Sequence, residues 1–510
     1  MKQYRTLIAI TVLLTLWTSL PGPAYSLTNA GDQVTLHAAG RGNPWINLHD
    51  GVDLPAIYTG PATLTQALEE NQAQPLSLAA GDFDEDGIPD LVSGYAGPDG
   101  GIVTLHRGSV DSIYPNSAEA QRRTAEDTST ESPYLSPARV FALPEPPEFL
   151  GTGDFDNDGH LDVVAAAHGS DVLHLLAGDG LGGFGPAEQV RLPGKVTALV
   201  TREARQRGGL MDLVLGIVGP EGPQVLLFGS PEGALRGGPE AFALAAEATA
   251  LTLGQLDEDY SVDLAVAAGH ELLIIHGRER RTLSDETEPA EVPPATIDQR
   301  SFPFAITSLA VGDFTGDHRT DLALLSEDGT AHLLVRPRKV GTGAMDASAE
   351  QADSSRSGRS YQQHGAPGVK ANSASIGASS SITLPHGSAN EDMPEWPTER
   401  TKAARPDWAE AELFSLPSPW SGNTQTSPTN LIAARVSGQP ADDLVVVDPT
   451  NHQLHILMGS QSSISNPSTT LRTGLQSPIS NPVTLDVEGE PAAVLPMRLN
   501  GDALHDLVIL

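Results

Sequence analysis

Short apolar segments recur along this chain and are separated by turns rich in Gly, Pro, Asp and Asn. In the clearest case an apolar segment at 76–80 runs into an acidic stretch, and a second apolar segment leaves it at 91–92. Segments of this length bounded by turn residues predict β-strands. The segment that leaves the acidic stretch is nearly all apolar, as at 444–447, which predicts a strand buried on both faces. The pattern therefore predicts an all-β protein.

An internal repeat organises these segments. The two clearest copies are Gly81-Asp-Phe-Asp-Glu-Asp-Gly-Ile-Pro-Asp90 and Gly153-Asp-Phe-Asp-Asn-Asp-Gly-His-Leu-Asp162, and five weaker copies follow. The seven repeats are centred on 82–90, 154–162, 204–212, 255–263, 313–321, 435–443 and 498–506. Each unit contains four short strand segments, and repeats of this length are typical of propeller blades. We therefore expect residues 27–510 to form a seven-bladed β-propeller of four-stranded blades.

Long insertions interrupt the repeat between third and fourth strands, at 109–136, 278–300, 338–410 and 460–481. The segment 341–405 is rich in Ser, Ala and Gly without steady periodicity, which predicts a disordered insertion within the propeller. The last repeat ends at Leu510 after its second strand, and residues 33–40 resemble the third strand at 102–108. A strand at 33–40 that completes the last blade would close the ring. A truncated chain is the alternative.

The acidic stretch has the ligand spacing of a cation-binding loop. Aspartates stand at positions 1, 3, 5 and 9 of the first two copies, with glycine at position 6. Calcium takes six to eight oxygen ligands, and glycine permits the positive φ that such a tight turn needs. Without a cation, the crowded carboxylates of a simple polar turn repel one another. We therefore expect calcium at two loops, each with a position-7 main-chain carbonyl as a further ligand. The candidate ligands are Asp82, Asp84, Asp86, Ile88 and Asp90 in the first loop, and Asp154, Asp156, Asp158, His160 and Asp162 in the second.

Two further loops keep an oxygen at each ligand position but have one carboxylate fewer. Their carboxylate and hydroxyl ligands are Asp257, Asp259 and Asp263 in the third, where Gln255 stands at position 1, and Asp313, Thr315, Asp317 and Asp321 in the fourth. Calcium affinity follows ligand charge, so these are two further possible calcium sites. The loops that end at Asp212, Asp443 and Asp506 have lost most earlier ligands. We expect them to be metal-free turns in which the last aspartate accepts backbone hydrogen bonds.

These units resemble the FG-GAP and VCBS repeat family, which is found in the propeller of integrin alpha subunits and in many secreted bacterial proteins. The resemblance rests on the first two acidic loops and on Gly178-Asp-Gly-Leu-Gly-Gly-Phe-Gly185, which is similar to the Phe-Gly element that names the family. It implies a seven-bladed propeller with calcium in the loops that connect strands. It also implies a role in adhesion or ligand binding.

The N-terminal segment and the net charge of the chain indicate where the protein acts and which partners it disfavours. Lys2 and Arg5 precede an apolar run at 7–16, and Ala24-Tyr25-Ser26 offers a cleavage site. This is the pattern of a secretory signal peptide at 1–26, and no other apolar stretch is long enough for a transmembrane anchor. We expect a protein that is secreted or held at the cell surface or in the periplasm. The formal net charge of −35 disfavours nucleic acid as a partner, and zero cysteines exclude disulfides and thiolate sites.

No catalytic motif stands out. A phosphate-binding loop, a metalloprotease His-Glu pair and a nucleophile elbow are all missing from the sequence. We therefore expect a non-catalytic binding or adhesion module with an extracellular protein or glycan ligand. The turns between second and third strands, at 97–101, 219–223 and 327–330, offer it a binding face. The alternatives are the propeller of a secreted carbohydrate-active enzyme, such as a polysaccharide lyase, and a structural stalk protein.

Overall fold

The computed structural model describes eleven stretches of the chain. They are residues 35–37, 53–54, 56–126, 132–201, 213–229, 233–259, 261–277, 294–336, 408–415, 431–459 and 482–510. All of them belong to one unit, Met1–Arg336 with Trp408–Leu510, whereas the second unit, Pro337–Asp407, lies outside the described residues. The expected signal peptide at 1–26, the whole insertion at 341–405 and the loop 204–212 with Asp212 also lie outside them.

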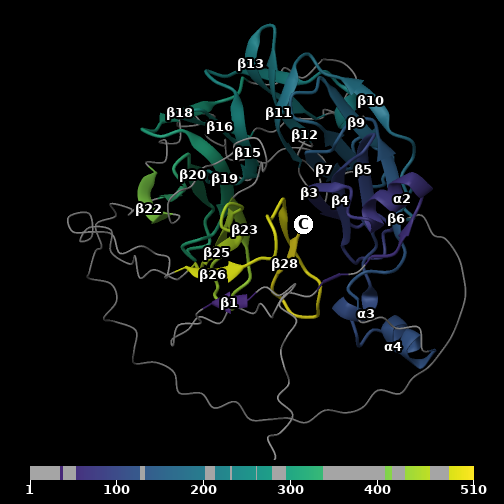
Figure 1. Cartoon of the computed structure of the whole chain (residues 1–510). Helices are drawn as coiled ribbons and strands as arrows, with labels where there is room; N and C mark the ends of the chain where they lie inside the picture. The colour runs from purple at the N-terminus through teal and green to yellow at the C-terminus, as the bar shows by residue number, and fades with distance from the viewer. Residues whose placement is uncertain are drawn as a thin grey trace, which may run out of the picture. The chain divides into compact units, whose positions relative to one another are not determined.

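Six antiparallel sheets, each built from four consecutive strands, make up most of the described chain (Figure 1). In chain order these blades are β3 to β6 (Gln74–Gly81, Asp90–Gly97, Gly100–His106, Ala138–Leu143), β7 to β10 (Phe149–Gly153, Asp162–Ala166, Val172–Leu176, Glu188–Arg191), β11 to β14 (Lys195–Thr201, Leu213–Gly219, Gly222–Phe228, Glu240–Ala243), β15 to β18 (Ala248–Gly254, Asp263–Ala268, Glu271–Ile275, Ile297–Ser301), β19 to β22 (Ile306–Gly312, Asp321–Ser326, Thr330–Val335, Ala409–Ser415) and β23 to β26 (Leu431–Ala434, Asp443–Asp448, Gln453–Leu457, Val483–Asp486).

The first strands of successive blades contact one another in the order β3, β7, β11, β15, β19 and β23, so they line the centre of the ring. The second strands are buried along their whole length in β8, β16, β20 and β24, as the apolar pattern predicts. The outer strands β10 and β18 are largely exposed or alternate. Apolar clusters form between neighbouring blades, for example Val164 and Leu173 against Leu215 and Leu226. The protein is an all-β β-propeller, and its core lies between the blades.

Helices are few and peripheral. The described ones are α2 (Ala62–Glu69), α3 (Val110–Ile113), α4 (Ala118–Ala125) and the 3-10 turn η1 (Ala234–Arg236). Helix α2 buries Ala67 and Leu68 against Ile102 and Val140 of the first blade. None of the helices in the described ranges is both long enough and apolar enough to cross a membrane.

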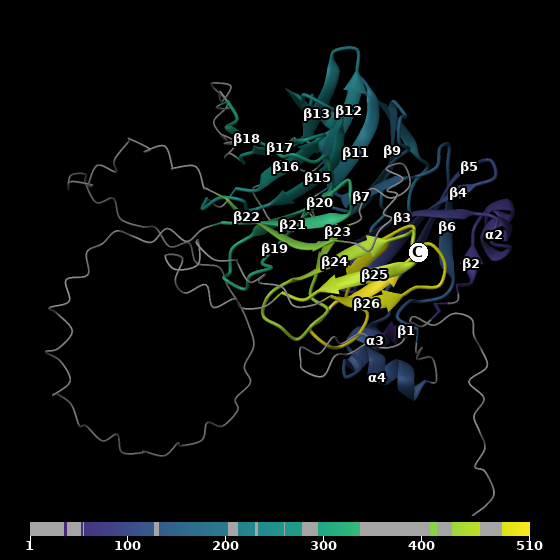
Figure 2. The ribbon, with the colours of Figure 1, turned by 60° about the vertical axis from the view of Figure 1, so that its left-hand side comes forward.

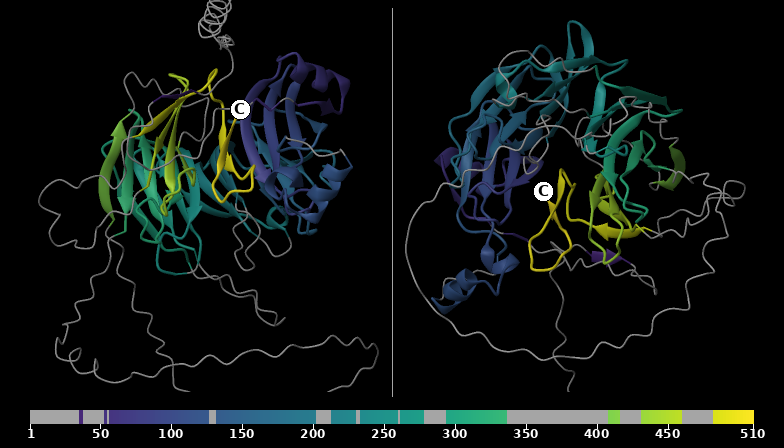
Figure 3. Two further views of the ribbon diagram at one scale, coloured as in Figure 1. Left: turned by 90° about the horizontal axis from the view of Figure 1, so that it is seen from below. Right: turned by 180° about the vertical axis from the view of Figure 1, so that it is seen from behind.

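The number of complete blades differs from the expectation, because six and not seven four-stranded blades are present in the described chain. The seventh repeat supplies only a two-stranded sheet, β27 (Val494–Met497) with β28 (Asp506–Ile509). Met497 and Val508 of this hairpin pack against the first blade, and Leu507 packs against the sixth. The hairpin therefore lies between these two blades, where Figure 3 shows it in yellow.

The expected ring closure by residues 33–40 is wrong. Strand β1 (Thr35–His37) pairs antiparallel with β26 and not with the terminal hairpin, with Leu36 opposite Leu485. It is thus a fifth strand on the outer edge of the sixth blade, whose strands Figure 2 shows side by side. The edge of a complete blade presents a row of unpaired backbone groups, and β1 satisfies them. Strand β2 (Tyr58–Thr59) adds similarly to the first blade, where it runs parallel to β6.

Candidate metal-binding loops

The four candidate loops connect the first strand of a blade to its second strand. At position 2 each loop carries an apolar side chain that is at most 1% exposed. These side chains are Phe83, Phe155, Leu256 and Phe314. Each one anchors its loop in the core between blades, and the neighbouring polar residues are left at the end of the blade. The alternation of apolar and acidic residues in the sequence is thus the reason why the carboxylates gather there.

Backbone hydrogen bonds turn the carboxylates of the first two loops inward. The position-1 carboxylates of Asp82 and Asp154 accept from the N–H groups of Gly87 and Gly159 at 3.0 and 3.1 Å. Both glycines have a positive φ, of 86° and 96°, as their place at position 6 predicts. The residues at position 4 are also left-handed, with φ of 58° at Glu85 and 61° at Asn157.

The fourth loop has the same shape although its glycine stands elsewhere. Gly316 supplies the left-handed residue at position 4 with φ of 69°, and His318 adopts φ of 64° at position 6. The Asp313 carboxylate accepts from the His318 N–H at 2.8 Å, as position 1 does in the first two loops. In the third loop the position-4 residue, Glu258, does not have a positive φ. The third loop therefore departs from the other three.

The aspartate at position 9 has a structural task in each loop that the structure describes. Asp90 is fully buried, and its two oxygens accept from the N–H groups of Phe83 at 2.8 Å and Gly108 at 2.7 Å. The two oxygens of Asp162 accept the equivalent hydrogen bonds from the N–H groups of Phe155 and Gly178. The carboxylate thus ties the start of the loop to the segment that follows the third strand. The aspartates of the two degenerate loops, Asp443 and Asp506, also accept backbone hydrogen bonds, as expected.

The first loop meets the requirements of a cation. Asp82, Asp84 and Asp86 offer ligand oxygens that all lie within 4.8 Å of one another. The Oδ1 atoms of Asp82 and Asp84 are buried without a hydrogen-bond partner, and the Asp84 side chain is only 10% exposed. A buried anionic oxygen without a partner is costly, and a divalent cation removes that cost. These residues therefore fit a calcium ion.

The second loop brings together Asp154, Asp156 and Asp162 within the same distance, and Asp158 is not part of this group. In the fourth loop, whose predicted ligands are all among the described residues, no such group forms. There the Oδ1 atom of Asp321 is buried without a partner, whereas its Oδ2 atom accepts from the N–H and hydroxyl of Thr315. The main-chain carbonyls of Ile88 and His160 stay a prediction.

Burial raises the pKa of several of these carboxyl groups toward neutrality. It raises the pKa of Asp90 and of Asp321 to about 7, and that of Asp162 to about 6. Neighbouring carboxylates, such as Asp84 beside Asp90, push in the same direction. Of these three residues only Asp162 belongs to a group of converging ligand atoms, and because ligation requires the ionised form, a cation bound there would release its proton.

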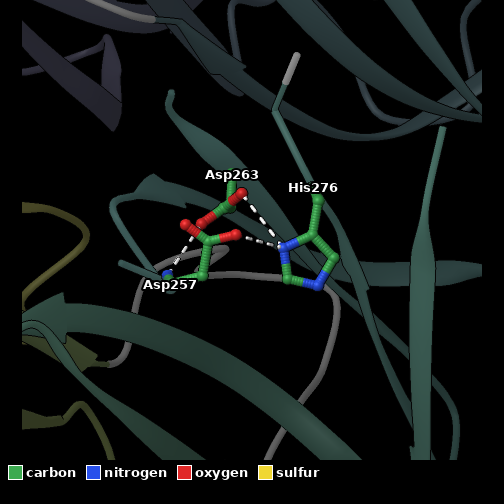
Figure 4. A group of neighbouring side chains, drawn as sticks. All are labelled: Asp257, Asp263 and His276. Atoms are coloured by element: carbon green, nitrogen blue, oxygen red, sulfur yellow. Dashed lines mark hydrogen bonds and ion pairs between the residues drawn. The ribbon is translucent and has the colours of Figure 1, made fainter. Parts of the chain in front are cut away.

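The third loop contains a histidine that the sequence analysis did not assign to it. The Nδ1 atom of His276 lies 3.0 Å from Asp257 Oδ2 and 3.4 Å from Asp263 Oδ1, as Figure 4 shows. Its Nε2 atom lies 3.2 Å from Asp298 Oδ2. The hydrogen bond to Asp263, with smaller contributions from Asp298 and Asp257, raises the pKa of His276 to about 9. Strand pairing is the missed signal, since Leu264 pairs with Ile275 and so sets His276 beside Asp263.

The glycine-rich segment at 178–185 covers the first loop. Phe184 packs edge-on against Phe83, with ring centroids 5.2 Å apart, and the Gly182 N–H donates to the Phe83 carbonyl at 3.0 Å. Glu85 of the first loop also bonds His160 of the second at 2.6 Å. The first two loops and this turn thus form one continuous polar surface across two blades.

Comparisons with known proteins do not assign this chain to a family. No family model matches the sequence, and no curated protein matches it. Similar solved structures include a crystal structure of BBS1N in complex with ARL6DN, at 11% identity and a TM-score of 0.42, covering 86% of this chain and 89% of that one. Another is the β-propeller domain of Cps50 (Swd1) from Myceliophteria thermophila, at 11% identity and a TM-score of 0.36, covering 82% and 88%. At such scores neither carries an argument, and the fold rests on the strand pairing described above.

Proposed function

We propose that this protein is an exported, calcium-binding propeller of the FG-GAP and VCBS type that binds a protein or glycan ligand without catalysing a reaction. The observation that carries the proposal is the pair of buried, unpartnered oxygens in the first loop, Asp82 Oδ1 and Asp84 Oδ1. Among the described residues Asp86 completes this group, and no histidine belongs to it. Calcium takes several oxygen ligands in flexible geometry, whereas magnesium demands a near-ideal octahedron and keeps waters.

Calcium would act here as a structural ion. It would be held by Asp82, Asp84 and Asp86 in the first loop, and by Asp154, Asp156 and Asp162 in the second. When bound it would supply positive charge that neutralises crowded carboxylates. Because Glu85 and His160 join the two loops, the ions would fix the relative position of the first two blades at this end of the propeller.

The proposal of a binding module is supported by the size of the cavity at the centre of the ring. The cavity is lined by the innermost strands of five blades together with residues 492–494, and has a volume of about 100 Å³. Pockets for small-molecule ligands usually measure about 300–1,000 Å³. The central cavity is therefore too small for a ligand that fills such a pocket. The short turns between second and third strands offer an outer surface instead. Figure 1 shows the strands that carry these turns.

Thermal unfolding of the full chain with calcium and with chelator tests the metal part. We expect calcium to raise the melting temperature and Asp84→Asn to remove one bound ion in equilibrium dialysis. Asp99→Asn is the matched control, since Asp99 is an exposed aspartate in the β4–β5 turn of the same blade. It should bind as many ions as the unchanged protein. Melting curves that are identical with and without chelator would refute calcium binding.

The ligand part needs a separate measurement. Glycan-array binding and capture of extracellular proteins, with turnover of the bound glycans followed at the same time, distinguish a binder from an enzyme. We expect a bound ligand that stays intact. Release of shortened or unsaturated sugars would instead favour a carbohydrate-active enzyme and contradict the proposal.

A further inference from the structure

The third loop combines nitrogen with oxygen donors, unlike the first two. Asp257 Oδ2, Asp263 Oδ1 and a ring nitrogen of His276 all lie within 4.8 Å of one another. Calcium and magnesium are bound by oxygen, whereas imidazole is a preferred ligand of zinc and other first-row transition metals. The composition of this group therefore points to a different class of metal.

The distances suit such an ion. The Nδ1 atom of His276 lies 3.0 Å from Asp257 Oδ2 and 3.4 Å from Asp263 Oδ1. Zinc binds nitrogen and oxygen ligands at about 2.0–2.2 Å in a tetrahedron, which places neighbouring ligand atoms about 3.4 Å apart. Both nitrogen–oxygen distances are close to that spacing, and the two carboxylate oxygens lie within 4.8 Å of each other.

The ligands are already oriented by a surrounding set of hydrogen bonds. The Asp298 carboxylate on β18 lies 3.2 Å from His276 Nε2 and can keep an N–H there, so that a metal ion would displace the proton on Nδ1 and bind that nitrogen. Asp257 Oδ1 accepts from the Asp259 N–H at 2.7 Å, and Asp263 Oδ2 accepts from the Leu256 N–H at 2.7 Å. The other oxygen of Asp257 faces His276, and the other oxygen of Asp263 lies near His276 while it also accepts from the Gly277 N–H at 2.9 Å. A carboxylate behind a metal-binding histidine is a general feature of such sites.

The backbone of the third loop also differs from that of the other three loops. The first, second and fourth loops share left-handed residues at position 4 and an aspartate at position 1. The third loop has Glu258 without a positive φ and Gln255 at position 1. It lacks both features that the other three loops share, and it has His276 in addition.

We propose that Asp257, Asp263 and His276 form a site for a transition-metal ion of the zinc class, with Asp298 as the positioning residue for His276. The three protein ligands leave a fourth position for water or a ligand group. The His276 side chain is 14% exposed, so the site opens to solvent and an ion can enter. The proposal is independent of calcium binding in the other loops.

Isothermal titration of the full chain with Zn²⁺ in excess Ca²⁺, together with Co²⁺ absorption spectra, tests the site. We expect one zinc ion to bind in spite of the calcium, and bound Co²⁺ to show the intense visible bands of tetrahedral coordination. His276→Gln should weaken zinc binding at least about 100-fold, and Asp298→Asn about 10–100-fold. His270→Gln is the matched control, because His270 is an exposed histidine in the β16–β17 turn of the same blade and should bind as the unchanged protein does.

Three outcomes would overturn the proposal. The first is a protein that binds no zinc, in which case His276 serves only as a cation paired with its carboxylates. The second is zinc binding that His276→Gln leaves unchanged, and the third is zinc that calcium displaces at equal concentration. Circular dichroism of each variant establishes that it is folded. If His276→Gln fails to fold, Asp298→Asn decides, since a tenfold loss in affinity with unchanged Co²⁺ geometry identifies a positioning role.

Discussion

Asp443 offers the sharpest test of the structural role assigned to position 9, because its loop has no calcium pattern. The residue is fully buried. Its Oδ2 atom accepts from the N–H groups of Val436 at 3.0 Å and Ser437 at 2.7 Å. Its Oδ1 atom accepts from the Ser437 hydroxyl at 2.8 Å and from the Gly459 N–H at 3.3 Å. One carboxylate therefore satisfies four donors, three in the loop after β23 and one in the segment that follows β25.

Asp443→Ala removes all four acceptors at once. The serine hydroxyl can turn to another partner, whereas the three backbone N–H groups are fixed. Leaving a buried donor unsatisfied costs about 1–3 kcal/mol, so the loss of the acceptor for three N–H groups should lower the free energy of unfolding by about 3–9 kcal/mol. Asp443→Asn keeps one acceptor oxygen but turns an NH₂ group toward N–H donors, and should cost about half as much. Folded proteins are stable by about 5–15 kcal/mol, so the loss is large.

Urea unfolding followed by circular dichroism measures this loss, once in calcium and once in chelator. The loss should be equal in both, because the loop at 435–443 has arginine and not a carboxylate at position 1. Asp99→Asn again supplies the exposed control and should change the free energy of unfolding by less than about 0.5 kcal/mol. A loss below 1 kcal/mol for Asp443→Ala, or one that appears only in calcium, would refute the reasoning.

Three further predictions concern the loops. The pKa of Asp90 and of Asp321 is about 7 in the folded state, so the folded state binds more protons than the unfolded state between about pH 4 and pH 7. In calcium-free buffer the melting temperature should therefore fall as pH rises through that window, and added calcium should reduce the fall. A melting temperature that rises between pH 4 and pH 7 would contradict this prediction. Gly87→Ala should lower the free energy of unfolding by about 1–2 kcal/mol, because alanine is strained at the φ of 86° that Gly87 adopts. No atom lies within 4 Å of the added methyl group, so no steric clash adds to this cost. An unchanged urea midpoint would argue against that strain. Phe155→Ala should cost about 3–5 kcal/mol by the same assay, because the ring is fully buried between blades; a loss below 1 kcal/mol would show that the ring does not anchor its loop.

The strands could be predicted from the sequence because each one is a local pattern. The apolar run that follows the first acidic loop becomes β4, and the apolar run at 444–447 lies within β24 at Asp443–Asp448. Ring closure could not be predicted in this way. Residues 33–40 look like a strand, but any free sheet edge can pair with a strand, and the choice between two edges depends on packing far away in the chain. The structure pairs β1 with β26, and so the expected seventh blade has two strands in the described chain.

The candidate sites also divide into those that a local sequence pattern predicts and one that depends on strand pairing. Asp82, Asp84 and Asp86 lie within five residues, so their spacing alone indicates that they converge. His276 follows a different strand from Asp257, and only the register of the β16–β17 hairpin brings the two together. A search for ligands within one loop therefore finds the oxygen-only sites and misses the site that contains nitrogen.

The role of position 9 changes what the repeat count means. An aspartate stands there in all seven copies, as a cation ligand common to every loop would. In the described loops, however, this carboxylate accepts N–H groups of its own loop, whether the earlier acidic residues are present, as beside Asp90, or missing, as beside Asp443. Its constant presence therefore follows from the needs of the blade. The positions that decide metal binding are 1, 3 and 5, together with the residue after the third strand, and these differ from blade to blade. The number and class of bound ions should accordingly be read from those positions and not from the number of repeats.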